Sequence, residues 1–156
     1  MNDNRGAAMV EMAIILSLLV VLFLGITELG RAVFFQQKMT KAVEASARFL
    51  GRAWDAVDRD TCATRTAWTT ATLAAGNLAV YGNAAGSGSP VVPGLAPGNL
   101  SYAVIARDVV GVGTVCVVQV RAQMQYEGIF GGQFIPLLGI AQPELTAASE
   151  ERYVGE

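Results

Sequence analysis

Residues 5–31 read RGAAMVEMAIILSLLVVLFLGITELGR and contain the longest apolar run of the chain. Within residues 7–27, the only charged side chain is that of Glu11. An α-helix rises about 1.5 Å per residue, so this segment would extend roughly 30 Å, the thickness of the hydrocarbon core of a bilayer. The segment 7–27 is therefore predicted to be a single membrane-spanning helix.

The helical pattern continues over residues 28–53 without a proline. Apolar residues recur here at spacings compatible with one stripe, namely Leu29, Val33, Phe34, Ala42, Ala45 and Phe49. Charged residues that suit water or a polar partner lie between them, namely Glu28, Arg31, Lys38, Lys41, Glu44 and Arg48. We expect one helix of about 45 residues that begins in the membrane and continues as an amphipathic stem.

The composition argues against several classes of function. The net charge is −2 and the basic residues form no dense patch, so nucleic-acid binding is not expected. The chain has no histidine, and Cys62 and Cys116 are its only cysteines, so neither a metal site nor another cofactor is expected. No nucleophile–base arrangement is recognisable, which argues against an enzyme. The aspartates at 55, 58 and 60 are interpreted as a solvated helix cap rather than a calcium site.

Two alternatives concern how the chain meets the membrane. A cleaved secretory signal usually has a shorter apolar core, and the first small-x-small triplet here, residues 45–47, lies too far downstream. The second alternative concerns orientation: one cation (Arg5) precedes the span and three follow it (Arg31, Lys38 and Lys41). The positive-inside rule alone would leave the C-terminal domain in the cytoplasm. A disulfide between the two cysteines would instead place that domain outside; two buried free thiols are the alternative.

The N-terminus resembles the processing signal of type IV pilins. A short polar leader, MNDNRG, ends at Gly6, and Glu11 follows five residues later. The resemblance implies that a prepilin peptidase removes residues 1–6 by cutting between Gly6 and Ala7, which places Glu11 at mature position five. The new α-ammonium of Ala7 would then lie one helical turn from Glu11. Glu11 would pair with the amine of its own chain or with that of a neighbouring subunit.

More narrowly, the chain resembles the TadE-like pseudopilins of the tight-adherence (Tad) pilus system. The resemblance rests on the segment just described, on ASARFLGR at the end of the stem, and on the region from VCVVQVRAQMQYEGIF to ELTAASEER. It implies a minor pilin that takes part in the assembly of an adhesive pilus. The expected partners are other pilins or pseudopilins and the inner-membrane assembly platform. The expected location is the bacterial inner membrane, in a single pass, with the C-terminal domain periplasmic or in the pilus.

The remaining residues, 54–156, predict a small extracytoplasmic α+β domain with an antiparallel sheet. A second helix is expected within residues 60–82, followed by a surface loop rich in glycine, serine and proline over residues 82–99. Two strands, residues 100–110 and 114–126, flank a hairpin turn, and the second alternates apolar and polar side chains. Residues 144–153 predict a third strand at an edge. Cys116 then lies in the second strand, where a bridge to Cys62 would tie the sheet to the segment after the stem.

The segment 128–140, GIFGGQFIPLLGI, is apolar but irregular. It would cover the core, rest on the bilayer or dock a partner, and Phe134 and Leu137 are the candidate contacts in the last case. The sequence therefore favours a pilus-assembly protein. The alternatives are a membrane-tethered extracytoplasmic binding or adhesion module that does not enter a fibre, and a small anchored enzyme.

Overall fold

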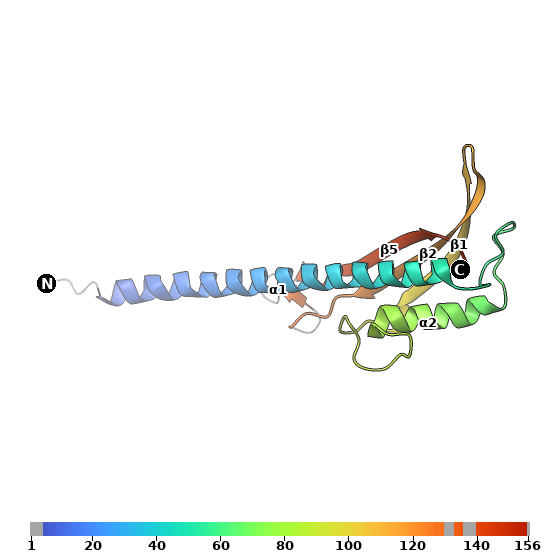
Figure 1. Ribbon diagram of the computed structural model, residues 1–156. Helices are drawn as coiled ribbons and strands as arrows, with labels where there is room; N and C mark the ends of the chain where they lie inside the picture. The colour runs from blue at the N-terminus through green and yellow to red at the C-terminus, as the bar shows by residue number, and fades with distance from the viewer. Residues whose placement is uncertain (1–4, 130–132, 136–139, 156) are drawn as a thin grey trace.

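A single long helix organises the molecule. The computed structural model describes residues 5–129, 133–135 and 140–155, and its first element is α1 (Arg5–Arg52), 48 residues long. The N-terminal half of α1 projects alone, whereas the C-terminal half runs along the rest of the chain (Figure 1). This arrangement confirms the prediction of one continuous helix that serves both segments.

Three antiparallel strands form the main sheet, in the order β1-β2-β5. They are β1 (Leu100–Val109), β2 (Gly113–Gln125) and β5 (Glu144–Arg152). The hairpin register runs without a shift from Leu100↔Ala122 to Val109↔Gly113. All three predicted strands and the α+β class are thus confirmed. A second, two-stranded sheet joins β3 (Gln133–Ile135) to β4 (Ile140–Ala141), within the segment that the sequence presented as irregular.

The predicted second helix is α2 (Ala67–Tyr81), which lies beside the C-terminal half of α1 (Figure 1). It ends at Gly82, whose φ of 73° lies in the left-handed region that favours glycine. The Ser46 hydroxyl of α1 donates a hydrogen bond of 3.0 Å to the carbonyl oxygen of Ala75 in α2. The short 3-10 helix η1 (Pro97–Asn99) then leads into β1.

The hydrophobic core lies between the two helices and one face of the sheet. The alternation predicted for β2 is confirmed for the apolar residues, because every second residue from Val118 to Tyr126 is buried. It is wrong at Gln119, which is also buried and whose side-chain amide donates a hydrogen bond of 2.6 Å to the Glu150 carboxylate. The face of the stem is different from the predicted one. The buried apolar residues of the stem are Ala32, Met39, Val43, Ala47 and Leu50. Leu29, Val33, Phe34 and Phe49, which the sequence placed on the packed stripe, are exposed.

The stem shows why periodicity alone misassigned its face. Apolar side chains occur around the whole helix, so a 3.6-residue period fits more than one stripe. The face that packs against α2 and the sheet carries Ala32, Ala47 and the hydroxyl of Ser46. These small side chains leave room for the neighbouring elements, and Met39, Val43 and Leu50 fill the rest of the same buried face. The large side chains of Phe34 and Phe49 lie outside it.

The loop between α2 and η1 is more than a surface connection. Val92 and Leu95 are fully or almost fully buried in the core. The backbone N–H of Val91 also donates a hydrogen bond of 2.8 Å to the carbonyl oxygen of Val80 in α2. The expectation of a pure surface loop over residues 82–99 is therefore wrong at these positions.

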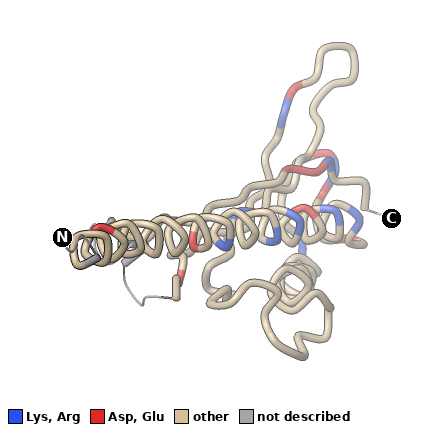
Figure 2. Tube along the Cα trace, turned by 90° about the vertical axis from the view of Figure 1, so that its left-hand side faces the viewer, with Lys and Arg blue, Asp and Glu red and all other residues tan. Residues whose placement is uncertain are grey.

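The β1–β2 hairpin extends beyond the rest of the sheet. Pairing between β2 and β5 begins at Val117↔Arg152, so the outer part of the hairpin is a two-stranded ribbon. Figures 1 and 2 both show it projecting away from α1. Val110 at its tip is fully exposed, and Val112 is 63% exposed.

Candidate functional site

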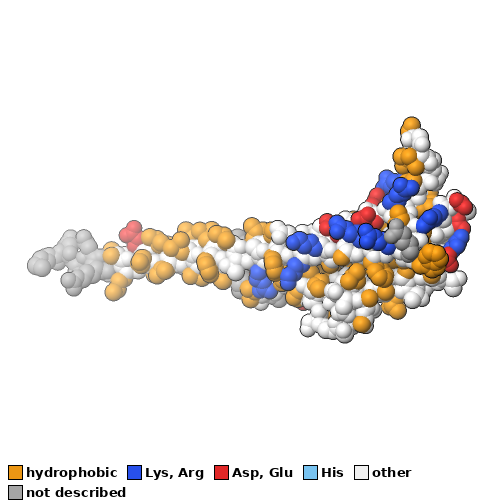
Figure 3. All heavy atoms as spheres, in the orientation of Figure 1, with side chains coloured by type: hydrophobic (Ala, Val, Ile, Leu, Met, Phe, Trp, Pro, Cys, Tyr) orange, Lys and Arg blue, Asp and Glu red, His pale blue; other side chains and the backbone are white. Residues whose placement is uncertain are grey.

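The free half of α1 is the most distinctive surface of the protein. It is long and apolar enough to cross a membrane, and the most apolar stretch has no buried residue. Apolar side chains cover its visible face, and Lys and Arg side chains begin where the helix reaches the folded domain (Figure 3). An apolar helix segment that is exposed in this way needs an apolar environment. One N-terminal helix of this kind fits a single-pass membrane anchor with the rest of the chain outside the membrane.

The residues of the expected processing signal lie at the start of this helix. Gly6 is in the first turn of α1 and is exposed, and a Cβ atom added to it would meet nothing within 4 Å. Ala7 and Glu11 are exposed and four residues apart, so they lie on one face of the helix. The folded domain leaves all three positions accessible to another protein.

A second carboxylate lies at the other end of the free segment, where the sequence reading did not place a site. Glu28 is fully buried, although it follows the apolar segment directly. Its Oε1 atom accepts a hydrogen bond of 2.7 Å from the backbone N–H of Ile129. Gly128 lies so close that a Cβ atom on it would overlap this oxygen atom. Glu28 thus joins the segment that follows β2 to helix α1.

Tyr126 completes this junction. Its side chain is fully buried, and its ring centroid lies 5.9 Å from that of Phe35 in α1. Burial raises the pKa of the Tyr126 hydroxyl, and the negative charge of Glu28 raises it further, against the opposing effect of Arg31. The hydroxyl is therefore neutral at physiological pH, as a group beside a buried carboxylate should be.

The predicted pairing of the two cysteines is present. Cys62 and Cys116 form a disulfide with a Cα–Cα distance of 5.3 Å. It links β2 to the loop between α1 and α2, and Tyr153 fastens the same loop to the end of β5. The Tyr153 hydroxyl donates to the carbonyl oxygen of Ala53 at 2.8 Å and accepts from the N–H of Ala56 at 3.0 Å.

The aspartates at 55 and 58 face a cation from their own chain. Arg65 forms ion pairs with both carboxylates, at 2.7 Å in the case of Asp58. Asp58 also accepts backbone hydrogen bonds from Asp60 and Thr61. The Arg65 guanidinium and these N–H groups hold the pKa of Asp58 well below its usual range. Among the described residues, no group of three or more His, Cys, Asp or Glu side chains could hold a metal ion.

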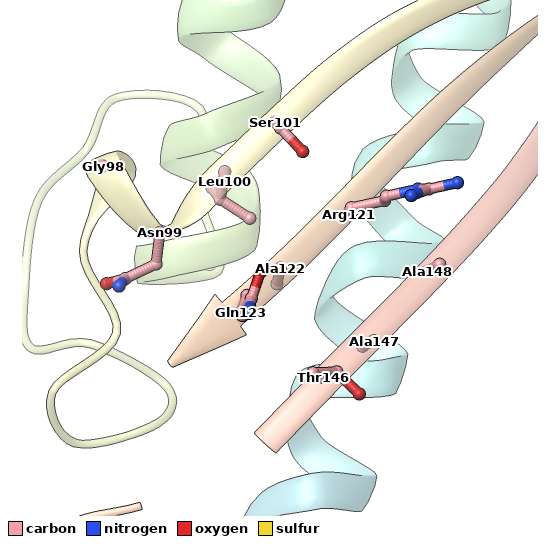
Figure 4. A pocket seen from close by; sticks show the side chains of 10 residues that line it. All are labelled: Gly98, Asn99, Leu100, Ser101, Arg121, Ala122, Gln123, Thr146, Ala147 and Ala148. Atoms are coloured by element: carbon pink, nitrogen blue, oxygen red, sulfur yellow. The ribbon is translucent and has the colours of Figure 1, made fainter. Parts of the chain in front are cut away.

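A shallow depression of about 580 Å³ lies on the sheet, lined by the start of β1, the C-terminal part of β2 and the middle of β5. Figure 4 shows Arg121 extending from β2 among small and polar neighbours that include Ser101 and Thr146. This lining offers one cation and several hydrogen-bonding groups. The residues around it form no nucleophile–base pair.

The proposed partner contacts cannot be placed on this surface. Leu137 lies outside the residues that the structure describes. Phe134 belongs to β3, but only its backbone is described. Of the neighbouring apolar residues, Ile129 is 57% exposed and Ile140 is 45% exposed. The described ends of this segment are thus accessible, and β3 lies against α1.

Comparison with known proteins supports the resemblance of the N-terminal region to TadE-like proteins. Residues 6–48 match the family model described as TadE-like protein. The match covers the free half of α1, including Gly6 and Glu11, and most of the stem, but none of the sheet. No curated protein and no solved structure matches the chain.

Proposed function

We propose that this chain, which is TadE-like over residues 6–48, is a minor pilin or pseudopilin of a Tad-type adhesive pilus. The observation that carries the proposal is the accessible Gly6 and Glu11 at the start of an apolar helix that has no buried residue in its most apolar stretch, in the part of the chain that the structure describes. A prepilin peptidase cuts between Gly6 and Ala7, and the mature chain takes part in assembly. The protein acts through interactions and has no chemistry of its own.

The proposed role of Glu11 follows from the cost of a charge beside lipid. An ionised carboxylate at the centre of a membrane costs upward of about 2.5 kcal/mol, so it needs a partner or a position near the surface. Cleavage supplies a partner, the α-ammonium of Ala7. When helices of several subunits pack together, Glu11 of one pairs with the amine of the next. A misaligned subunit would leave a buried charge unpaired, and the pairing thereby sets the register.

We infer a location in the bacterial inner membrane, with the folded domain in the periplasm or in the pilus. The disulfide supports this orientation, because such bonds persist outside the cytoplasm and are rare within it. The assembly platform and the other pilins of the same pilus are the proposed partners. The three cations after the span oppose this orientation by the positive-inside rule, whereas the disulfide supports export.

The processing step is tested by the intact mass and N-terminal residue of the protein from cells with and without prepilin peptidase. We expect a mature chain that begins at Ala7 only when the peptidase is present. Gly6→Leu should abolish processing, because a bulky side chain blocks the cut. Gly30→Leu is the matched control, since this glycine lies in the same helix and also has open space around it. A chain processed at Ala7 in the Gly6→Leu variant would contradict the proposed site.

The assembly step is tested with Glu11→Ala. The variant should insert in the membrane and be processed normally, but it should support little or no pilus formation. Surface pili sheared from cells and quantified by immunoblot are the measurement. Glu127→Ala is the control, because this exposed glutamate lies in the folded domain. Wild-type pilus levels with Glu11→Ala would remove Glu11 from the mechanism.

A membrane-tethered binding or adhesion module outside the fibre is the second candidate. The depression around Arg121 and the projecting hairpin with exposed Val110 favour it, because both offer contact surfaces on the folded domain. Dependence on prepilin peptidase separates the two candidates. A tethered module would keep its leader and function without the peptidase.

A further inference from the structure

The position of Glu28 suggests where the membrane surface lies on this protein. Its buried carboxylate accepts the N–H of Ile129, so the chain after β2 reaches the helix at this level. Gly128 contacts the same carboxylate, and β3 also contacts α1. The folded domain therefore begins at Glu28, with no length of bare helix between the end of the apolar segment and the domain.

The length of the apolar helix places the membrane surface at the level of Glu28. If Glu11 lies in the polar layer on one side, the helix within the hydrocarbon begins at Met12. A hydrocarbon core of about 30 Å needs about 20 residues of α-helix, which ends at Arg31. Residues 12–27 alone supply only about 24 Å. The bilayer core then extends past Glu28, to the level where the chain after β2 meets the helix.

We propose that the protein has a lipid-contacting collar at this level, formed by the exposed apolar residues Leu29, Val33, Phe34, Ile129 and Ile140. Each of these side chains is between 45% and 57% exposed. The occupant is the lipid surface itself, because Leu29, Val33 and Phe34 directly follow the exposed apolar residues of the free helix. Ile129 is held at this level by its hydrogen bond to Glu28, and Ile140 belongs to the strand that pairs with β3, which contacts α1. The inference rests on the membrane anchoring in the proposed function and extends it to residues of the folded domain.

The charges around the collar match a membrane interface. Lys38 lies with its Nζ 4.7 Å from the centroid of the Phe34 ring, and the Arg31 guanidinium lies 5.6 Å from that of Phe35. Lys and Arg side chains are typical of this layer, where their apolar stems contact apolar groups and their charges reach the headgroups. Anionic headgroups would be the ligands of these cations.

The collar also explains why Glu28 is enclosed. A carboxylate at this depth would be costly if it faced lipid. The Ile129 N–H supplies a hydrogen bond and the segment around Gly128 shields the charge, leaving Glu28 fully buried. The same contact that fastens the domain to the helix thus separates the carboxylate from the bilayer.

The test places an environment-sensitive fluorophore on single added cysteines at Ile129 and Ile140. The native cysteines are both in the disulfide, so the added thiol is the one that reacts. Phe23→Cys, within the span and 70% exposed, is the membrane control, and Val110→Cys at the hairpin tip is the aqueous control. Full-length protein is reconstituted in vesicles of phosphatidylethanolamine and phosphatidylglycerol. Quenching by aqueous iodide is compared with quenching by nitroxide-labelled lipid.

We expect the labels at 129 and 140 to be quenched several-fold more by the lipid quencher than the label at 110, and several-fold less by iodide. Quenching by iodide equal to that at 110 would overturn the collar. Protection from both quenchers would overturn it as well, because another copy of the protein and not lipid would cover these positions. If the label at 23 also fails to report lipid, the membrane anchoring of the proposed function fails. A lipid signal at 23 alone refutes only the collar.

Discussion

Glu28 and Ile129, 101 residues apart in the chain, are joined by a hydrogen bond of 2.7 Å from a backbone N–H to a buried carboxylate. This bond closes the sheet domain onto the helix at the end of the apolar segment. Neither residue has a signature in the sequence, since Glu28 resembles the other charged residues of the stem. The contact depends on Gly128, because only a residue without a Cβ atom fits beside the carboxylate.

Gly128→Ala should therefore lower the stability of the folded domain. The added methyl group would overlap Oε1 of Glu28 and force the carboxylate or the chain after β2 to move. Overpacking of this kind costs about 1–3 kcal/mol. Thermal unfolding of the purified protein in detergent measures the effect. Gly98→Ala is the control, because this glycine has open space around it and an ordinary φ. Equal melting temperatures for the two variants would contradict a close fit at Gly128.

The sequence predicted those elements whose signals are local. The helix up to Arg52 follows from an uninterrupted apolar and then amphipathic pattern, and β2 follows from strict alternation between Val118 and Tyr126. The disulfide was predictable because only one pairing exists. Each of these conclusions depends on residue type and spacing within one segment.

The remaining features depend on contacts between distant segments. Val92 and Leu95 are buried because their loop folds back over the core, and nothing in a run of glycine and proline indicates this. The stem has apolar residues on several sides, so the sequence did not distinguish the face with Met39 from the face with Phe34. Glu28 is enclosed by residues 126–129, which no local pattern connects to it.

Removal of the disulfide should destabilise the domain substantially. The bond joins residues 54 positions apart, and loop-closure entropy for a loop of that size corresponds to about 4 kcal/mol. We expect Cys62→Ser/Cys116→Ser to lose about 2–4 kcal/mol in denaturant unfolding. Reduction of the wild-type protein should reproduce the loss. The double variant should be insensitive to reductant, and a wild-type midpoint that reductant leaves unchanged would contradict the stabilising role.

Stability should fall in acid through Asp58. Its pKa is held below the ordinary value by Arg65 and by backbone N–H groups, so the folded state binds this proton less readily than the unfolded chain does. The contribution is complete above the ordinary aspartate pKa of about 3.9 and is lost as the pH falls from there toward the lower pKa of the folded state. Thermal unfolding between about pH 5 and pH 2 should show a weaker pH dependence for Asp58→Asn than for the wild type. Asp60→Asn is the control, and an unchanged slope in Asp58→Asn would contradict the assignment.

Gly76 in α2 is the second position where a missing side chain permits a close contact. A Cβ atom there would lie 2.7 Å from the hydroxyl oxygen of Tyr102 in β1, but 3.9 Å from the ring carbon that bears it. Burial raises the pKa of Tyr102 to about 12, so the hydroxyl is neutral in any ordinary assay. Only the hydroxyl is in conflict with an alanine, and the ring is not.

Gly76→Ala should consequently be destabilising in the wild type and stabilising in a Tyr102→Phe background. Alanine within a helix gains about 0.5–1 kcal/mol over glycine, and this gain is hidden as long as the hydroxyl is present. The two substitutions should couple by about 1–3 kcal/mol, because the overlap exists only when the alanine methyl group and the tyrosine hydroxyl are both present. A double-mutant cycle by chemical unfolding measures this coupling. Additive effects would mean that α2 and β1 adjust without cost and that the packing of this helix on the sheet is not close at Gly76.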